Sequence, residues 1–187
     1  MGKGNIKEVK LYAECYMDLA FLLFILYYNE NGNFERIEEA HKRRKFKICG
    51  KVYELNHSEA MGYAKVINNV KESNYAIGFI DAPKNKNFES GIRNLLEKMG
   101  FTESHNKFGV GVWMATNGGK VLILNRTIEI WLRGQGLKHI GENDKITDVR
   151  KGIKLLKNGL LEGNALSKVW QDIIDFFTKE IISFTPL

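Results

Sequence analysis

Cysteine and proline are scarce in this chain of 187 residues, which contains 2 of each. The two cysteines, Cys15 and Cys49, are too few for a disulfide framework or for a zinc site built from cysteines alone. We therefore expect reduced thiols and a cytoplasmic protein. The scarcity of proline excludes a long proline-rich linker, and a composition of 44% hydrophobic and 27% charged residues is typical of a folded domain.

Long hydrophobic runs are also absent. The most apolar stretch, residues 19–28, is about half as long as the ~20 residues that a membrane helix requires. It has no small-residue cleavage site after it, so it does not resemble a signal peptide. Residue 6 is Ile, where a myristoylation motif requires Ser or Thr. We expect no membrane association.

The positive charges slightly outnumber the negative ones, with 28 Lys and Arg against 22 Asp and Glu. A net charge of +6 is compatible with a polyanionic partner such as nucleic acid, but it does not identify one. The strongest basic feature is a run that follows His41, next to Phe46 and Tyr53, whose rings we expect to stack on bases. The residues expected to bind phosphate are Lys42, Arg43, Arg44 and Lys45. An ordinary solvated hairpin explains this run equally well.

Hydrophobic periodicity predicts alternating strands and helices. Strands are expected at 8–13, 75–80, 108–115 and 121–124, a hairpin at 41–55 that turns at Gly50, and helices at 18–28, 58–70, 87–99, 127–132, 144–156 and 165–182. Asp18 is the expected cap of the first helix. Ser58 is the expected cap of the second, whose apolar stripe would be Ala60, Ala64 and Ile67.

This alternation predicts an α/β fold, with a mainly parallel sheet and helices on both faces. We expect residues 1–135 to form the α/β domain and residues 136–187 to form a helical extension packed on the same domain. The side chains expected to pack the last helix on the sheet are Val169, Trp170, Ile173, Ile174, Phe176 and Phe177.

Two acidic residues come directly after predicted strands. Glu14 follows the first strand and Asp81 follows the most apolar one, and ligands of parallel sheets bind at such carboxyl ends. Asp18 lies one helical turn beyond Glu14. Carboxylates that converge repel one another unless a cation neutralises them, and oxygen ligands suit Mg2+. Spacing alone favours the simpler interpretation that Asp18 is only a helix cap.

The same residues resemble a known family. Residues 11–22, from Leu11 through Glu14 to Leu22, resemble the opening motif of Toprim domains, and residues 77–85 resemble the second Toprim motif, a strand ending in Asp-x-Asp. Residues 108–119 are similar to a strand and glycine-containing loop of small stand-alone Toprim proteins related to the overcoming-lysogenization-defect nucleases. An acid on a short helix commonly follows there, and Glu129 is its nearest match. The resemblance covers residues 8–132.

This resemblance implies a Mg2+ site and a role for each acid. Glu14 would be the general acid/base, Asp81 the principal metal ligand, and Glu14 and Asp18 would complete the metal set. Lys84 and Lys86, just beyond Asp81, would add phosphate contacts.

The sequence departs from the Toprim pattern in two places. The second acid of Asp-x-Asp is Pro83, and Cys15 replaces the glycine that usually follows the glutamate. Proline supplies neither a metal ligand nor a backbone N–H, so we do not expect a two-metal site.

Three functional hypotheses remain. The first is a Mg2+-dependent nuclease or phosphotransferase that acts on nucleic acid. The second is a catalytically degenerate Toprim-like module that binds nucleic acid, a nucleotide or a protein without turnover. The third is an α/β protein of another lineage, in which Glu14 and Asp81 need not be close in space.

Overall fold

The computed structural model describes residues 7–57, 62–73, 76–81, 86–137, 140 and 146–184, and it describes only the backbone of 86–89. The first half contains β1 (Lys7–Ala13), α1 (Tyr16–Asn31), the 3-10 helix η1 (Ile37–Lys42), β2 (Lys45–Ile48), β3 (Lys51–His57), α2 (Tyr63–Glu72), β4 (Ala76–Asp81) and α3 (Lys86–Lys98). The second half contains β5 (Phe101–Lys107), β6 (Val110–Ala115), β7 (Lys120–Leu124), α4 (Ile128–Gly134), α5 (Val149–Leu160), β8 (Leu161–Glu162), β9 (Ala165–Leu166) and α6 (Lys168–Ile182).

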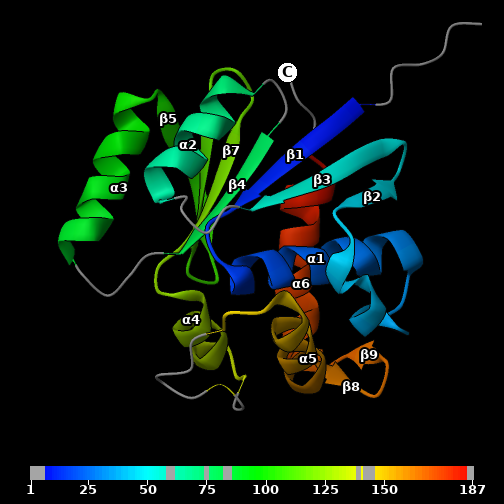
Figure 1. Cartoon of the computed structure of the whole chain (residues 1–187). Helices are drawn as coiled ribbons and strands as arrows, with labels where there is room; N and C mark the ends of the chain where they lie inside the picture. Colours follow the sequence, from blue (N-terminus) through cyan, green and yellow to red (C-terminus); the bar gives the residue numbers. More distant parts are fainter. Residues whose placement is uncertain are drawn as a thin grey trace, which may run out of the picture.

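Seven strands form one sheet in the order β2-β3-β1-β4-β7-β6-β5. The four central strands β3, β1, β4 and β7 are parallel, whereas β2 and the β5–β6 hairpin add antiparallel edges. Helices cover both faces: α2 and α3 pack on one, α1 and α6 pack on the other, and α5 packs against α1 (Figure 1). The expected α/β class with a mainly parallel sheet is confirmed.

The β5–β6 hairpin was not predicted. The expected strand at 108–115 begins only at Val110, because Phe108 and Gly109 form the turn of the hairpin with positive φ angles. In β5 only Phe101 is buried, and its remaining residues are polar and exposed. A strand of this kind at the edge of a sheet has no hydrophobic alternation by which it can be recognised.

Helix α1 is buried on all sides, as its uniform apolarity predicted. Residues 17–26 are fully inaccessible, between the sheet and α5 and α6. The helix nevertheless begins two residues earlier than expected, with Cys15 as its N-cap. The prediction that Asp18 caps the helix is therefore wrong, and Asp18 lies inside the first turn. Among the described residues, no helix is long and apolar enough to cross a bilayer.

The helix predicted at 58–70 differs in its bounds and in its buried face. Ser58 and Ala60 lie outside the described residues, and α2 begins after Gly62. Its buried residues are Val66, Ile67 and Val70, whereas Ala64 is exposed. The predicted apolar stripe is therefore right for Ile67 and wrong for Ala64. Gly78 in β4 permits this packing, because a Cβ there would meet Val66 at 2.9 Å.

The C-terminal helices are present with shifted bounds. Helix α5 begins at Val149, after its cap Asp148, and continues through Asn158 and Gly159, where the sequence predicted a break. Helix α6 begins at Lys168, because residues 165–166 instead pair with β8. The predicted packing residues of α6 are buried except Val169, which is 67% exposed.

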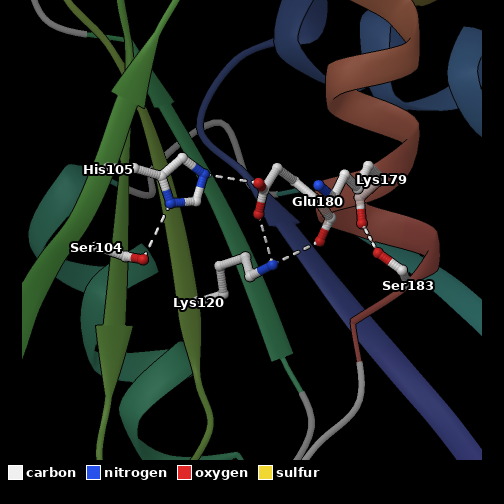
Figure 2. Close-up of polar contacts among 6 residues, drawn as sticks. All are labelled: Ser104, His105, Lys120, Lys179, Glu180 and Ser183. Carbon is white, nitrogen blue, oxygen red and sulfur yellow. Dashed lines mark hydrogen bonds and ion pairs between the residues drawn. The ribbon is translucent and has the colours of Figure 1, made fainter.

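A buried ionic cluster joins α6 to the sheet (Figure 2). Lys120 of β7 donates to a carboxylate oxygen of Glu180 and to its backbone oxygen, both at 2.8 Å. The second carboxylate oxygen of Glu180 is 2.7 Å from Nε2 of His105 in β5. Burial alone would raise the pKa of Glu180, but its hydrogen bonds and ion pairs with Lys120 and His105 outweigh that effect and lower it. This Lys120–Glu180–His105 cluster is a satisfied polar network.

Candidate functional site

The connections of the sheet change direction at β1. The chain leaves β1 through α1 on one face to reach β3, and it returns through α2 on the other face to β4, on the opposite side of β1. The parallel register places Ala13 opposite Phe79, so the residues that follow Ala13 and Phe79 emerge at the same edge. Crevices for ligands form at such switch points in parallel sheets.

Asp18 is buried at this edge without a partner. It is 0% exposed, and neither of its carboxylate oxygens has a hydrogen-bond partner in the part of the chain that the structure describes. Burial raises the pKa of Asp18 well above its ordinary value, and the charges of Asp81, Glu14 and Glu129 raise it further. The neighbouring thiol of Cys15 favours the ionised form but does not offset these effects. An unpaired carboxylate in such a place is costly for the folded protein.

Asp81 and Glu14 complete an acid cluster with Asp18. Asp81 is the last residue of β4, and its Oδ2 accepts a hydrogen bond from the backbone N–H of Ile128 at 3.0 Å. Burial raises the pKa of Asp81 despite that bond. Glu14 has one buried, unpartnered carboxylate oxygen, and burial together with the charge of Asp81 raises its pKa to about 7. The structure thus brings together the three acids that the sequence singled out.

Glu129 and Cys15 border the acid cluster. Glu129 lies in the first turn of α4, close enough for its charge to act on Asp18. Cys15 presents its sulfur on the same side, so that Sγ and the carboxylate oxygens of Asp18 and Asp81 lie within 4.8 Å of one another. Burial, followed by the charges of Asp18 and Asp81, raises the pKa of the Cys15 thiol. The sequence analysis assigned Cys15 no ligand role and noted it only as a departure from the Toprim pattern.

His57 is a neighbour of the site that the sequence reasoning missed. It ends β3 opposite Ala13, and its ring lies 4.8 Å from that of Tyr16. Both ring nitrogens are shielded from solvent. Burial lowers the pKa of His57 and the positive charge of Arg44 lowers it further, whereas an interaction with the backbone of Ala13 opposes the shift without cancelling it. The carboxyl-end rule that selected Glu14 and Asp81 also applies to the end of β3, but only once β3 is known to run parallel to β1.

The basic side chains of residues 42–45 are less available to bind phosphate than the sequence suggests. Arg43 pairs with Glu30 at 2.6 Å, and Lys45 lies within 4 Å of both Glu8 and Glu54. Arg44 donates to backbone carbonyl oxygens, and Lys42 ends η1 instead of lying in the β2–β3 hairpin. Two of the four basic residues, Arg43 and Lys45, therefore lie against acidic residues.

The prediction of base-stacking rings in the hairpin is wrong. Phe46 is 1% exposed, and Tyr53 is buried with its hydroxyl donating to the backbone oxygen of Ile182. Of the two lysines expected beyond Asp81, Lys84 lies outside the described residues. Lys86 begins α3, but its side chain is outside the description.

Comparisons with known proteins do not assign this chain to a family. No protein-family model matches the chain, and a search of curated proteins finds no significant match. The resemblance to Toprim domains therefore stays a prediction, and the site has to be interpreted from its own chemistry.

Glu14, Asp18 and Asp81 place like charges at the edge of the sheet, and no ion pair joins any of the three to a basic side chain among the described residues. Within the described part of the chain Asp18 has no donor and Glu14 has one shielded oxygen without a donor, while Asp81 accepts from the backbone N–H of Ile128. Three ionised carboxylates in this arrangement are destabilising by themselves. A divalent cation removes the repulsion and supplies partners for the shielded oxygens, so the residues present fit such an ion.

Proposed function

We propose that this protein binds a divalent cation at the carboxyl ends of β1 and β4 and hydrolyses phosphodiester bonds of a nucleic acid there. The proposal follows the Toprim-like arrangement of Glu14, Asp18 and Asp81. The observation that carries it is Asp18, a fully buried carboxylate beside two further acids, whose oxygens have no hydrogen-bond partner among the described residues. A structural role such as helix capping does not account for Asp18, because Cys15 is the cap.

The metal-binding role belongs to Asp18 and Asp81. Their carboxylate oxygens are already close, and the backbone N–H of Ile128 orients one oxygen of Asp81. A bound divalent cation would stabilise the negative charge that develops on a phosphate during its hydrolysis. The resemblance alone also placed Glu14 in the metal set, but Glu14 does not belong to the group of ligand atoms that lie within 4.8 Å.

Glu14 is suited to proton transfer. Its pKa of about 7 leaves a substantial part of the carboxyl group ionised and part protonated near neutral pH. Acid/base catalysts work best when the pKa lies near the operating pH. Glu14 takes a proton from water, the water oxygen forms a bond to phosphorus, and the ester P–O bond breaks. The leaving oxygen then takes up a proton, so that hydrolysis consumes one water molecule.

The choice of a nucleic acid rests on charge near the site. The chain has a net charge of +6, and the charge of Arg44 reaches His57 at the end of β3. Arg126 is exposed between β7 and α4, at the same edge of the sheet as Asp81. Positive groups on both sides of an acidic cation site are suited to a phosphate backbone.

The test is a cleavage assay with labelled single-stranded DNA, duplex DNA and RNA of one sequence, each with and without Mg2+ or Mn2+. We expect cation-dependent cleavage of at least one substrate by the wild type. Glu14→Gln and Asp81→Asn should each lower the rate by about 100-fold or more, the usual effect of losing a positioned catalytic group. Glu162→Gln, which removes an exposed acid of β8, is the matched control and should leave the rate unchanged.

Two other outcomes would contradict the proposed catalysis. If all substrates remain intact but one binds in a salt-dependent way, the protein is a binding module of the second hypothesis. If cleavage occurs and survives both Glu14→Gln and Asp81→Asn, another site carries the reaction.

A further inference from the structure

The N-cap position of α1 places a sulfur beside the acid cluster. Cys15 has extended backbone angles, φ −128° and ψ 170°, and its Sγ accepts a hydrogen bond from the backbone N–H of Asp18 at 3.5 Å. This contact directs the sulfur into the first turn of α1, where the Asp18 carboxyl group also lies. The side chain is partly buried and forms no disulfide.

Three ligand atoms from separate positions in the chain meet at this place. Cys15 Sγ and one oxygen each of Asp18 and Asp81 all lie within 4.8 Å of one another. Asp18 is independent support for a bound ligand, because it is 0% exposed and neither of its oxygens has a hydrogen-bond partner within the described ranges of the chain. The group is therefore more than a lone cysteine or a set of surface acids.

We propose that Cys15 is a metal ligand together with Asp18 and Asp81, and that the site takes a thiophilic divalent ion of the zinc type in preference to Mg2+. The inference rests on the cation site of the proposed function but not on cleavage of nucleic acid. Mg2+ is a hard ion that is held by oxygen in octahedral geometry. Thiolate ligands select zinc-like ions instead.

The spacing of the ligand atoms fits such an ion. Zinc bonds are about 2.3 Å to sulfur and about 2.0–2.2 Å to carboxylate oxygen, which places tetrahedral ligands roughly 3.5 Å apart. The ligand atoms lie up to 4.8 Å apart in the structure, and small rotations of the side chains would shorten these distances to about that value. Three protein ligands leave the fourth position of a tetrahedral site open, as in catalytic zinc centres, and water or a phosphate oxygen would occupy it.

This assignment also separates ligand from proton carrier at the end of β1. Cys15 completes the ligand set, so Glu14 keeps the proton-transfer role with no need to coordinate the ion. The cysteine that stands where Toprim domains usually have glycine would then shift the metal preference of the site from Mg2+ to zinc-like ions.

The test is a Co2+ titration followed by absorption, using the Cys49→Ser protein, in which Cys15 is the single remaining cysteine. Cobalt bound to a thiolate shows a near-ultraviolet charge-transfer band that cobalt bound only to oxygen lacks. We expect this band to appear in both Cys49→Ser and the wild type, to saturate at one equivalent, and to vanish on addition of Zn2+. The Cys15→Ser protein should bind Co2+ without the band.

Calorimetry gives the expected size of the effect. Cys15→Ser should weaken Zn2+ binding by about 100-fold or more, since loss of an outer-shell partner alone costs up to about that much. Mg2+ binding should change far less, because serine retains an oxygen at the same place. Circular dichroism checks that the variant is folded.

The results distinguish the two proposals. Saturable Co2+ binding to Cys49→Ser without a charge-transfer band would overturn the role of Cys15 and leave an oxygen-only cation site intact. Tighter binding of Mg2+ than of Zn2+ by the wild type would also overturn it. Absence of saturable binding of any of these ions would overturn both this inference and the cation site on which it rests.

Discussion

Two buried clusters of charge in this protein have opposite electrostatic character. In the Lys120–Glu180–His105 cluster a carboxylate is paired on both oxygens, and the net effect lowers the pKa of Glu180 (Figure 2). In the acid cluster of Glu14, Asp18 and Asp81, burial raises all three pKa values, and neighbouring like charges add to the effect at Glu14 and Asp18. The first cluster is complete by itself and joins α6 to the sheet. The second is complete only when something positive is bound.

The contrast shows how a structural cluster is distinguished from a functional one within a single fold. Burial is similar for Glu180, which is 7% exposed, and Asp18, which is 0% exposed. The difference is in the partners, because the lysine and histidine beside Glu180 have no counterpart beside Asp18 among the described residues. Perturbed acids without internal partners are the ones that point to a ligand.

The largest effect should come from breaking the paired cluster. Lys120→Met leaves Glu180 buried with a single partner that is itself half-exposed, so we expect the free energy of unfolding to fall by about 3–5 kcal/mol. Urea denaturation measures this change. The double variant Lys120→Met/Glu180→Leu removes both charges and should recover much of the loss. A loss below about 1 kcal/mol in the single variant would show that the ion pair contributes little.

A substitution in the acid cluster should instead raise the free energy of unfolding. Asp18→Asn removes an unpaired buried charge, so the metal-free protein should become more stable at pH 8 by about 0.5–2 kcal/mol, the range of single stabilising substitutions. The same urea measurement applies, with EDTA present. A clear destabilisation at pH 8 would mean that the Asp18 carboxylate has a stabilising partner.

A fall in pH should change the stability contributed by the two clusters in opposite directions. The folded-state pKa of Glu14 is raised from 4.5 to about 7, so its contribution to stability is fully present below pH 4.5 and is lost as the pH rises through about 7. The pKa of Glu180 is lowered, so its contribution is present above 4.5 and is lost as the pH falls through the folded-state value.

Stability profiles of two variants separate these contributions. Glu14→Gln should flatten the slope between pH 4.5 and about 7 in the metal-free protein, whereas Glu180→Gln should change the profile mainly below pH 4.5. Cation binding to the wild type should strengthen as the pH rises toward 8, because ligands must lose protons before they bind metal. A binding constant that is the same at pH 6 and pH 8 would argue against proton release at the site.

The smallest effect should come from an exposed pair. Lys157 and Glu38 lie 3.7 Å apart, with side chains 34% and 46% exposed. Lys157→Ala should change stability by less than about 0.5 kcal/mol, because water screens such pairs. A larger loss would indicate that Lys157 stabilises the contact between α5 and η1 by packing as well as by charge.

The sequence predicted the parallel centre of the sheet because its strands and helices have distinct hydrophobic patterns. It failed where the pattern is weak or ambiguous. The polar edge strand β5 has one buried residue, and the apolar Val169 falls on the exposed side of α6. Helix starts were also displaced, as at α1, where a cysteine serves as the cap.

The acid cluster was foreseeable in part. The carboxyl ends of parallel strands meet at one edge, so Glu14 and Asp81 followed from two recognised strands. The burial of Asp18 and the position of the Cys15 sulfur did not follow, because both depend on a cap that begins α1 two residues earlier than expected. His57 required the register of β3 against β1, which periodicity does not supply.

The most direct test of the account is calorimetric titration of Mn2+ into the wild-type and Asp18→Asn proteins, with Glu162→Gln as the control. Carboxylates accept Mn2+ whether or not a thiolate takes part. The account predicts saturable binding at one site in the wild type and the control, and its loss in Asp18→Asn. Equal binding by all three proteins, or none by the wild type, would contradict the claim that the buried acids form a cation site.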